Sequence, residues 1–307
     1  MSDFPTMRVD RARSDSMETL GSKPKFWFRD GKRRMLFKAD DRGTGEDWAK
    51  VVACHLCTLL GLPHVEYELA AEYDGQQYVR PGVVCENMAP KPVVLVPGNE
   101  LLLAVDPQYP STPRSKFKVP QHSVAAVIEI VKTLEPPDPL WLADAPDGIQ
   151  SALDFFVGYV MLDAWIANTD RHHENWAAIW HRQENKLRLA PTFDHGAALA
   201  RNLRDTERED RLSTKDRNRT VTAFVQRGRS AFYASPTDRR PLQLCEAFRE
   251  FAQRVPGAAK AWLERLRAVN QEQTWAILER VPAERMSETC KRFTAELLHT
   301  NQQRLQQ

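Results

Sequence analysis

The chain has 307 residues, of which 42% are hydrophobic and 27% are charged, and its formal net charge is +2. This composition is typical of a globular protein with one large domain or two lobes, and so small a net charge gives no global field that would draw the chain to nucleic acid or a membrane. No apolar run approaches the ~18 residues of a membrane helix. Residues 1–20 are polar and lack the apolar core of a secretory signal, so we expect a flexible tail there. The five scattered cysteines predict no disulfide framework and a cytoplasmic location.

Two hairpins and one helix are predicted in the first ninety residues. Asp-Gly pairs at 30–31 and 74–75 each lie between apolar runs, which predicts hairpins over 25–39 and 65–85. Between them, the apolar spacing over 47–60 predicts a helix that ends at the glycine and proline just beyond it. The expected unit is a small antiparallel sheet with one helix.

The remainder of the chain is predicted to be mainly helical. Residues 88–120 hold seven prolines and read as an irregular connection. Beyond it, apolar periodicity predicts helices over 122–134, 150–167, 241–254, 258–280 and 287–305. A short strand pair, 176–180 with 187–189, interrupts these helices.

A polar loop is predicted between the apolar helix that ends near Ile166 and the strand that starts at Trp176. It contains Asp170 and Asn175 in the spacing Asp-x-x-x-x-Asn. In kinases this spacing puts a carboxylate that orients the substrate hydroxyl and an amide that binds magnesium on one loop. The spacing arises readily by chance, so it indicates a kinase only together with other features.

Two further features fit the same chemistry. The run Phe193-Asp194-His195-Gly196 follows a predicted strand and resembles the Asp-Phe-Gly magnesium site, in which Asp194 offers the hard oxygen that magnesium prefers. Lys38 ends an apolar strand, where a lysine is uncommon unless its ammonium group meets an anion such as a phosphate. Each feature alone could be a plain turn or an edge lysine, whereas all three in this order favour phosphoryl transfer from ATP.

From about residue 21 to about residue 298 the sequence resembles the HipA-like kinases, distant relatives of protein kinases and phosphatidylinositol kinases. The segments that carry this resemblance are 21–25, 36–38, 59–63, 168–172 with Asn175, and 189–194. The run Asn-Thr-Asp-Arg-His at 168–172 is the most specific of them. The resemblance implies an α+β, bilobed protein-kinase-like fold, with a small antiparallel β-rich N-lobe at 21–90, an irregular connection at 91–120 and a larger, mainly helical C-lobe at 121–307.

The resemblance also implies roles for single residues and two cofactors, ATP and Mg²⁺. Asp170 is expected to be the catalytic base, and Asn175 and Asp194 the magnesium ligands. The ATP-binding residues are expected to be Lys38 and the phosphate-covering Gly21 and Ser22, with Glu86 to Met88 at the adenine. Ser22 is then a candidate for autophosphorylation, since a phosphate there would repel the phosphates of ATP.

The chain departs from the family in two ways. It is short for HipA itself and is not expected to contain its extra N-terminal subdomain, so toxin behaviour does not follow. The family also places an acidic residue on the first helix, where it pairs with the ATP lysine. Here Lys50 occupies that position, and Glu46 lies one turn earlier. Either Glu46 pairs with Lys38 or the pair is absent.

Two other groups of residues have the composition of a metal site. Cys54-His55-Leu56-Cys57 looks like half of a zinc site, but a structural zinc site needs four ligands and no second pair exists, so a helix is favoured. His172, His173, Asp194 and His195 could form a metal-dependent phosphohydrolase site. The order Asp-His and the adjacent histidines fit that class poorly, and His172 is expected to brace the loop backbone.

The substrate remains open at the level of sequence. A protein serine or threonine is favoured, with a small molecule or a lipid headgroup as the alternative, and a nucleotide-binding pseudokinase that acts as an interaction module as a third. Residues 201–229 hold nine basic and five acidic residues. We expect mostly a solvated loop there, although its basic strip could contact RNA or an acidic protein. No membrane partner is expected.

Overall fold

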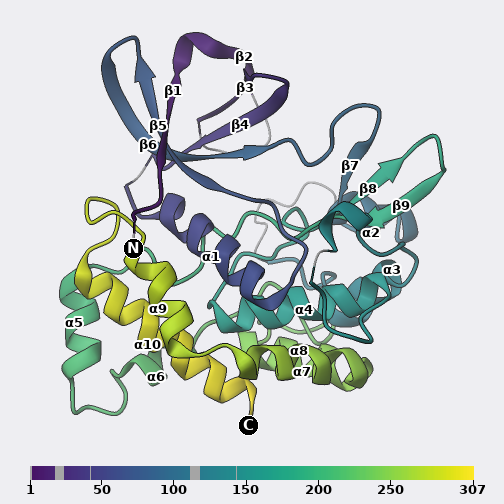
Figure 1. The fold of residues 1–307 in the computed structure, drawn as a ribbon. Helices are drawn as coiled ribbons and strands as arrows, with labels where there is room; N and C mark the ends of the chain where they lie inside the picture. The colour runs from purple at the N-terminus through teal and green to yellow at the C-terminus, as the bar shows by residue number, and fades with distance from the viewer. Residues whose placement is uncertain (1, 18–23, 42, 111–117, 143) are drawn as a thin grey trace.

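The computed structural model describes residues 2–17, 24–41, 43–110, 118–142 and 144–307. Within these residues the chain forms a six-stranded sheet, a three-stranded sheet and ten α-helices. Figure 1 shows the larger sheet gathered at one end of the molecule and most of the helices at the other. The structure therefore combines a sheet from the first third of the chain with a mainly helical remainder that contributes two strands to the smaller sheet.

The six-stranded sheet has the order β1-β5-β6-β4-β3-β2. Its strands are β1 (Thr6–Asp10), β2 (Ser14–Met17), β3 (Lys25–Asp30), β4 (Arg33–Ala39), β5 (Glu68–Asp74) and β6 (Gln77–Glu86). Neighbouring strands are antiparallel except for β1, which runs parallel to β5. Both predicted hairpins are confirmed, with Gly31 and Gly75 in the left-handed conformation at their turns.

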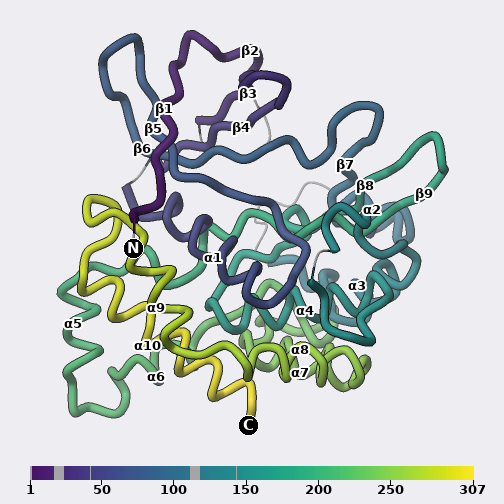
Figure 2. The backbone as a smooth tube through the Cα atoms, in the orientation of Figure 1, coloured from purple at the N-terminus to yellow at the C-terminus, as the bar shows by residue number. Residues whose placement is uncertain are grey.

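The flexible tail expected at residues 1–20 is wrong for residues 6–17, which form β1 and β2. The two strands lie at opposite ends of the sheet order, although only the 3₁₀ turn η1 (Arg11–Arg13) separates them. The sheet must therefore curl until its edges approach each other. Val9 is fully buried with Phe28 and Phe37 in an apolar cluster of this sheet. In Figure 2 the start of the chain, near the helices, rises through β1 into this sheet.

Helix α1 (Glu46–Leu60) packs against the sheet and confirms the helix predicted at 47–60. Its start is fixed by Asp40, whose carboxylate accepts hydrogen bonds from the backbone of Thr44 and Gly45. It ends at Gly61, whose φ of 71° only glycine adopts readily. The five cysteines are buried free thiols, and the described residues contain no cluster of three metal-ligating side chains. The helix is therefore the better interpretation of the Cys-His-Leu-Cys run.

The three-stranded sheet joins β7 (Val94–Pro97), β8 (Ala177–His181) and β9 (Lys186–Leu189) in that order. The predicted β8–β9 hairpin is confirmed. Strand β7 and helix α2 (Gly98–Val105) lie in the stretch expected to be irregular. The many prolines of this stretch argued against regular structure. However, β7 has only four residues and lies at the edge of its sheet, where the proline at its end costs no ladder hydrogen bond.

The other helices are α3 (Val124–Val131), α4 (Ala152–Trp165), α5 (Asp205–Ser213), α6 (Val221–Gln226), α7 (Leu244–Arg254), α8 (Pro256–Ala268), α9 (Gln271–Glu279) and α10 (Glu288–Leu305), and Pro139–Trp141 forms a 3₁₀ turn. All but one of the residues of α4 are buried, so this helix runs through the core. The single helix predicted over 258–280 is two helices, because Asn270 caps the start of α9. The loop predicted at 201–229 contains α5 and α6. Among the described residues, no helix is long and apolar enough to cross a bilayer.

Candidate active site

A buried arginine holds the loop after α4 against that helix. Arg171 donates through Nε and Nη2 to the two carboxylate oxygens of Asp163, with Nη2 and Oδ1 2.8 Å apart. Asn168 donates its side-chain amide to the same carboxylate at 2.7 Å. The two charged side chains are at most 4% exposed. A bidentate pair of this kind fixes orientation as well as distance, so the loop has a defined conformation.

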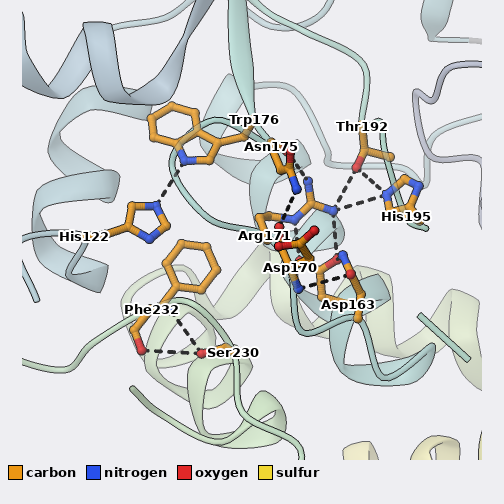
Figure 3. Close-up of polar contacts among 11 residues, drawn as sticks. His122, Asp163, Asp170, Arg171, Asn175, Trp176, Thr192, His195, Ser230 and Phe232 are labelled. Carbon is orange, nitrogen blue, oxygen red and sulfur yellow. Dashed lines mark hydrogen bonds and ion pairs between the residues drawn. The ribbon is translucent and has the colours of Figure 1, made fainter. Parts of the chain in front are cut away.

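The same guanidinium joins this loop to the segment after β9. Arg171 Nη1 donates to the carbonyl of Asn175 at 3.2 Å, and Nη2 donates to Thr192 Oγ1 at 2.9 Å. Nη2 also lies 3.3 Å from Nε2 of His195. Figure 3 shows these side chains converging on the arginine. Arg171 therefore sets the spacing between the Asp170–Asn175 loop and the Asp194 segment.

His195 is a neutral member of this network. A guanidinium N–H can only donate, so Nε2 of His195 accepts from Arg171, and the ring proton lies on Nδ1. Thr192 Oγ1 is 2.8 Å from the same Nε2. Burial, with the charge of Arg171, holds the pKa of His195 well below its usual range. His195 thus braces the segment rather than supplying charge.

Two lysines meet the carboxylate of Asp194. Nζ of Lys38, from β4, lies 3.3 Å from Oδ2, and Nζ of Lys50, from α1, lies 3.1 Å from Oδ1. Burial alone would raise the pKa of the Asp194 carboxyl, but the two ammonium groups hold that pKa well below its usual range. The Asp194 side chain remains 34% exposed, so the ionised carboxylate can still be approached from solvent.

The backbone also presents the Asp194 side chain. Asp194 has a φ of 59°, a left-handed conformation that is uncommon for a residue other than glycine. Its N–H donates to the hydroxyl of the buried Tyr67 at 3.3 Å, and the ammonium group of Lys38 lies 5.8 Å from the centre of the Tyr67 ring. Residues in such conformations cluster at functional sites, where the surrounding contacts hold them in place.

Asp170 and Asn175 lie at the two ends of their loop and are linked to each other. The Asn175 side-chain amide donates to the carbonyl of Asp170 at 2.6 Å. Nε2 of His172 lies 3.5 Å from the Asp170 carboxylate, and Nδ1 of His172 accepts the N–H of Glu174 at 3.2 Å. The expected brace by His172 on the loop backbone is confirmed. Because the Asn175 nitrogen is bound internally, its amide oxygen is the atom with capacity for a metal.

These residues fit a magnesium ion. The candidate ligands, an Asp194 carboxylate oxygen and the Asn175 amide oxygen, are the hard oxygen donors that magnesium prefers. Asp194 is ionised and partly exposed, and its geometry is fixed from both sides by lysine contacts. Lys38 adds the cation expected beside a phosphate.

The other candidate residues are placed as follows. The carboxylate of Glu46 lies 2.6 Å from Nη2 of Arg201, while the carboxylate that reaches Lys38 is that of Asp194. Glu86 ends β6, and Met88, beyond the sheet, packs in part against the main core. Their role at adenine stays a prediction. Gly21 and Ser22 lie outside the described residues.

The phosphohydrolase alternative is not supported by the geometry. His173 Nδ1 is 2.7 Å from the Tyr109 hydroxyl, and His195 faces Thr192 and Arg171. The rings of His172 and His173 are nearly perpendicular, at 85°. Among the described residues, no three metal-ligating side chains gather at one point.

Sequence reasoning missed the supporting contacts. Asp163 lies in an apolar helix. A single carboxylate among apolar residues indicates a buried polar or charged partner, and this was the available signal. The contacts of Arg171 do not follow from its place in the Asn-Thr-Asp-Arg-His motif. The pairing of Lys50 with Asp194 joins residues 144 positions apart, so no local pattern could show it.

Known proteins resemble this chain in structure rather than in sequence. No protein-family model matches the chain, and no curated protein matches it in sequence. CtkA, a proinflammatory kinase of Helicobacter pylori, matches in structure with a TM-score of 0.69 and 18% identity, over 98% of this chain and 95% of CtkA. HipA of Shewanella oneidensis MR-1, solved with HipB and operator DNA, matches with a TM-score of 0.53 and 10% identity.

The chain has a HipA-like kinase fold. The match to HipA covers 95% of this chain and 65% of the HipA chain. The resemblance read from the sequence motifs is thus confirmed at the level of the fold. Two of the segments that carry the motifs, 168–172 with Asn175 and 189–194, meet at Arg171, which donates hydrogen bonds to Asn175 and Thr192 (Figure 3).

Proposed function

We propose that this protein transfers the γ-phosphoryl group of ATP, with magnesium, to a serine or threonine hydroxyl of a protein. One observation carries the proposal. Asp194 contacts Lys38 of the sheet, and Arg171 ties the Asp194 segment to the loop that bears Asp170 and Asn175. This links the groups that phosphoryl transfer requires, namely a phosphate-binding cation, oxygen ligands for a metal and a carboxylate for the nucleophile.

Each side chain then has a separate task. Asp194 and Asn175 would hold magnesium, which when bound neutralises charge on the phosphate oxygens. Lys38 binds phosphate through its ammonium group. Burial opposes the charge on Lys38, yet Asp194 and other neighbours raise its pKa above the usual value, so it stays charged. The contacts of Arg171 keep the loop and the Asp194 segment in register, and positioning supplies most of the rate in such reactions.

Asp170 acts on the nucleophile. Its carboxylate orients the substrate hydroxyl and takes up its proton as the oxygen forms a bond to the γ-phosphorus. The bond from that phosphorus to the β–γ bridging oxygen breaks, and ADP leaves. Proton removal by a positioned carboxylate contributes about 10²–10⁴-fold to the rate.

A protein substrate is preferred to RNA for the segment over 201–229. Several of its basic side chains are already paired, with Arg208 on Asp205 and Arg219 on Asp210, both at 2.7 Å. Arg201 is bound to Glu46. These pairs reduce the positive strip that an RNA backbone would need. We also propose Ser22 as a site of autophosphorylation.

The test is transfer of label from γ-labelled ATP. Purified protein is incubated with magnesium and either itself, a protein lysate or lipid vesicles, and phosphopeptides are mapped by mass spectrometry. Label on serine or threonine, including Ser22, supports the proposal. Label in lipid alone indicates the lipid-kinase alternative, and tight ATP binding without transfer to any acceptor indicates a pseudokinase.

A further inference from the structure

Lys50 is a buried cation whose charge the proposed roles do not use. It lies in the second turn of α1, its side chain is 6% exposed, and its Nζ is 3.1 Å from Asp194 Oδ1. Lys38 occupies the other oxygen of the same carboxylate at 3.3 Å. Two ammonium groups therefore share one carboxylate, one on each oxygen.

The charges of this group do not balance. Lys38 and Lys50 contribute two positive charges and Asp194 contributes one negative charge. At the start of α1, Glu46 pairs with Arg201 at 2.6 Å and Asp47 pairs with Arg285. Keeping excess charge in a partly buried place is costly unless an anion compensates it. The group is thus suited to receive negative charge.

The fold makes room for Lys50 at this position. A Cβ placed on Gly196 would lie 2.9 Å from Cε and 3.0 Å from Nζ of Lys50. The glycine two residues after Asp194 therefore leaves the space that the ammonium group fills. Gly196, which has no side chain, thus accommodates Lys50 beside the site.

We propose that Lys50 is a second phosphate-binding cation of the ATP site, acting beside Lys38. This inference rests on the proposed function. Because both Nζ atoms contact one carboxylate, an anion held by Lys38 lies within the field of Lys50. Salt, whose Debye length is about 8–10 Å, screens the interaction between Lys50 and such a close, partly buried anion only weakly. An acid at position 50 would remove this second positive charge and place a negative charge beside the Asp194 carboxylate.

The experiment is a charge series at position 50, read by calorimetric titration with adenosine, ADP and ATP, each with and without magnesium. Lys50→Arg should bind ATP as wild type does. Lys50→Met should lose about tenfold or more in ATP affinity, less in ADP affinity and none in adenosine affinity. Lys50→Glu should lose more than Lys50→Met. The losses should persist without magnesium, because they concern phosphate rather than the metal.

Two controls separate this role from a structural one. Lys291→Met removes another buried lysine, which donates to the Glu279 carbonyl at the end of α9, and should leave ATP affinity unchanged. Gly196→Ala should displace the head of Lys50 and lower ATP affinity while Lys50 itself is retained. Without nucleotide, the thermal unfolding temperature of Lys50→Met should be no lower than that of wild type. The rise in unfolding temperature on adding ATP should be smaller in the variant.

The outcomes are distinct. If wild type binds ATP and Lys50→Met or Lys50→Glu binds it equally well or more tightly, Lys50 is not a phosphate cation, and the proposed function is unaffected. If Lys50→Met loses adenosine affinity to the same extent as ATP affinity, the role is structural and the inference is wrong. If wild type binds no nucleotide under any condition, both proposals are overturned.

Discussion

Arg171 and Asp163 form a two-point ion pair inside the core, between the last turn of α4 and the loop that carries Asp170. Neither side chain is more than 4% exposed. The arginine uses its remaining N–H groups on Asn175, Thr192 and His195. One buried side chain thus ties together both segments of the candidate site.

Replacing Arg171 by Met should therefore unfold the protein more easily and loosen the site. Removal of one partner leaves the Asp163 carboxylate buried without its counter-charge, which typically costs about 3–5 kcal/mol. Urea unfolding followed by tryptophan fluorescence measures this loss. Arg33→Met breaks an exposed pair with Asp30 and should change the unfolding free energy by at most ~1 kcal/mol. Equal effects of the two variants would show that the buried pair has no special role.

Buried histidines predict how stability depends on pH. Burial lowers the pKa of His122 from 6.5 to about 3, with smaller contributions from His173, His172 and Arg171. The folded state excludes a proton that the unfolded chain binds below pH 6.5, so the unfolding free energy should fall as pH decreases from about 6.5 toward 3. Each such histidine contributes a slope of about 1.4 kcal/mol per pH unit.

The quantity to compare is the slope of the unfolding free energy against pH, not its absolute value. Unfolding free energies of wild type and His122→Asn, measured between pH 6.5 and 5, should show a shallower decline in the variant. The variant is also expected to be less stable throughout, because Trp176 donates to His122 and His122 bonds the Ala231 carbonyl. Parallel declines would mean that His122 titrates normally in the folded state.

Much of the fold could be predicted because its signals are local. Asp-Gly turns, the left-handed Gly61 and the apolar stripe of α1 depend on neighbouring residues alone. Strand β1 could not be predicted in this way. Val9 is its one fully buried residue, so no alternating pattern marks the strand, and pairing with β5 across some sixty residues defines it.

The candidate site likewise combines residues that local sequence signals mark with contacts between distant segments that they do not mark. Asp170, Asn175 and Asp194 could be proposed because spacing and flanking strands mark them in the sequence. Their geometry depends on contacts between distant segments, such as Lys38 with Asp194 and Arg171 with Thr192. The alternative in which Glu46 pairs with Lys38 came from the family resemblance and the helical register, and neither could anticipate Arg201, which lies 155 residues further along the chain.

Asp194→Asn and Asn175→Ala should each weaken the effect of magnesium on nucleotide affinity. Each removes an oxygen ligand, or the charge of one, from a site suited to that metal. Asp194→Asn should also free both lysines from their carboxylate, so ATP affinity without magnesium should hold or rise. Calorimetric titration of ATP with and without magnesium tests both. A variant that keeps the full magnesium effect of wild type excludes that residue as a ligand.

The most direct test of the account is phosphoryl transfer by wild type and Asp170→Ala, measured with γ-labelled ATP and magnesium at matched nucleotide occupancy. The carboxylate acts on the substrate hydroxyl and not on the nucleotide, so the variant should bind ATP about as tightly as wild type. Transfer should fall by about 10²–10⁴-fold, the usual value of a positioned general base. Undiminished transfer by Asp170→Ala would contradict the assignment of this loop as the catalytic one.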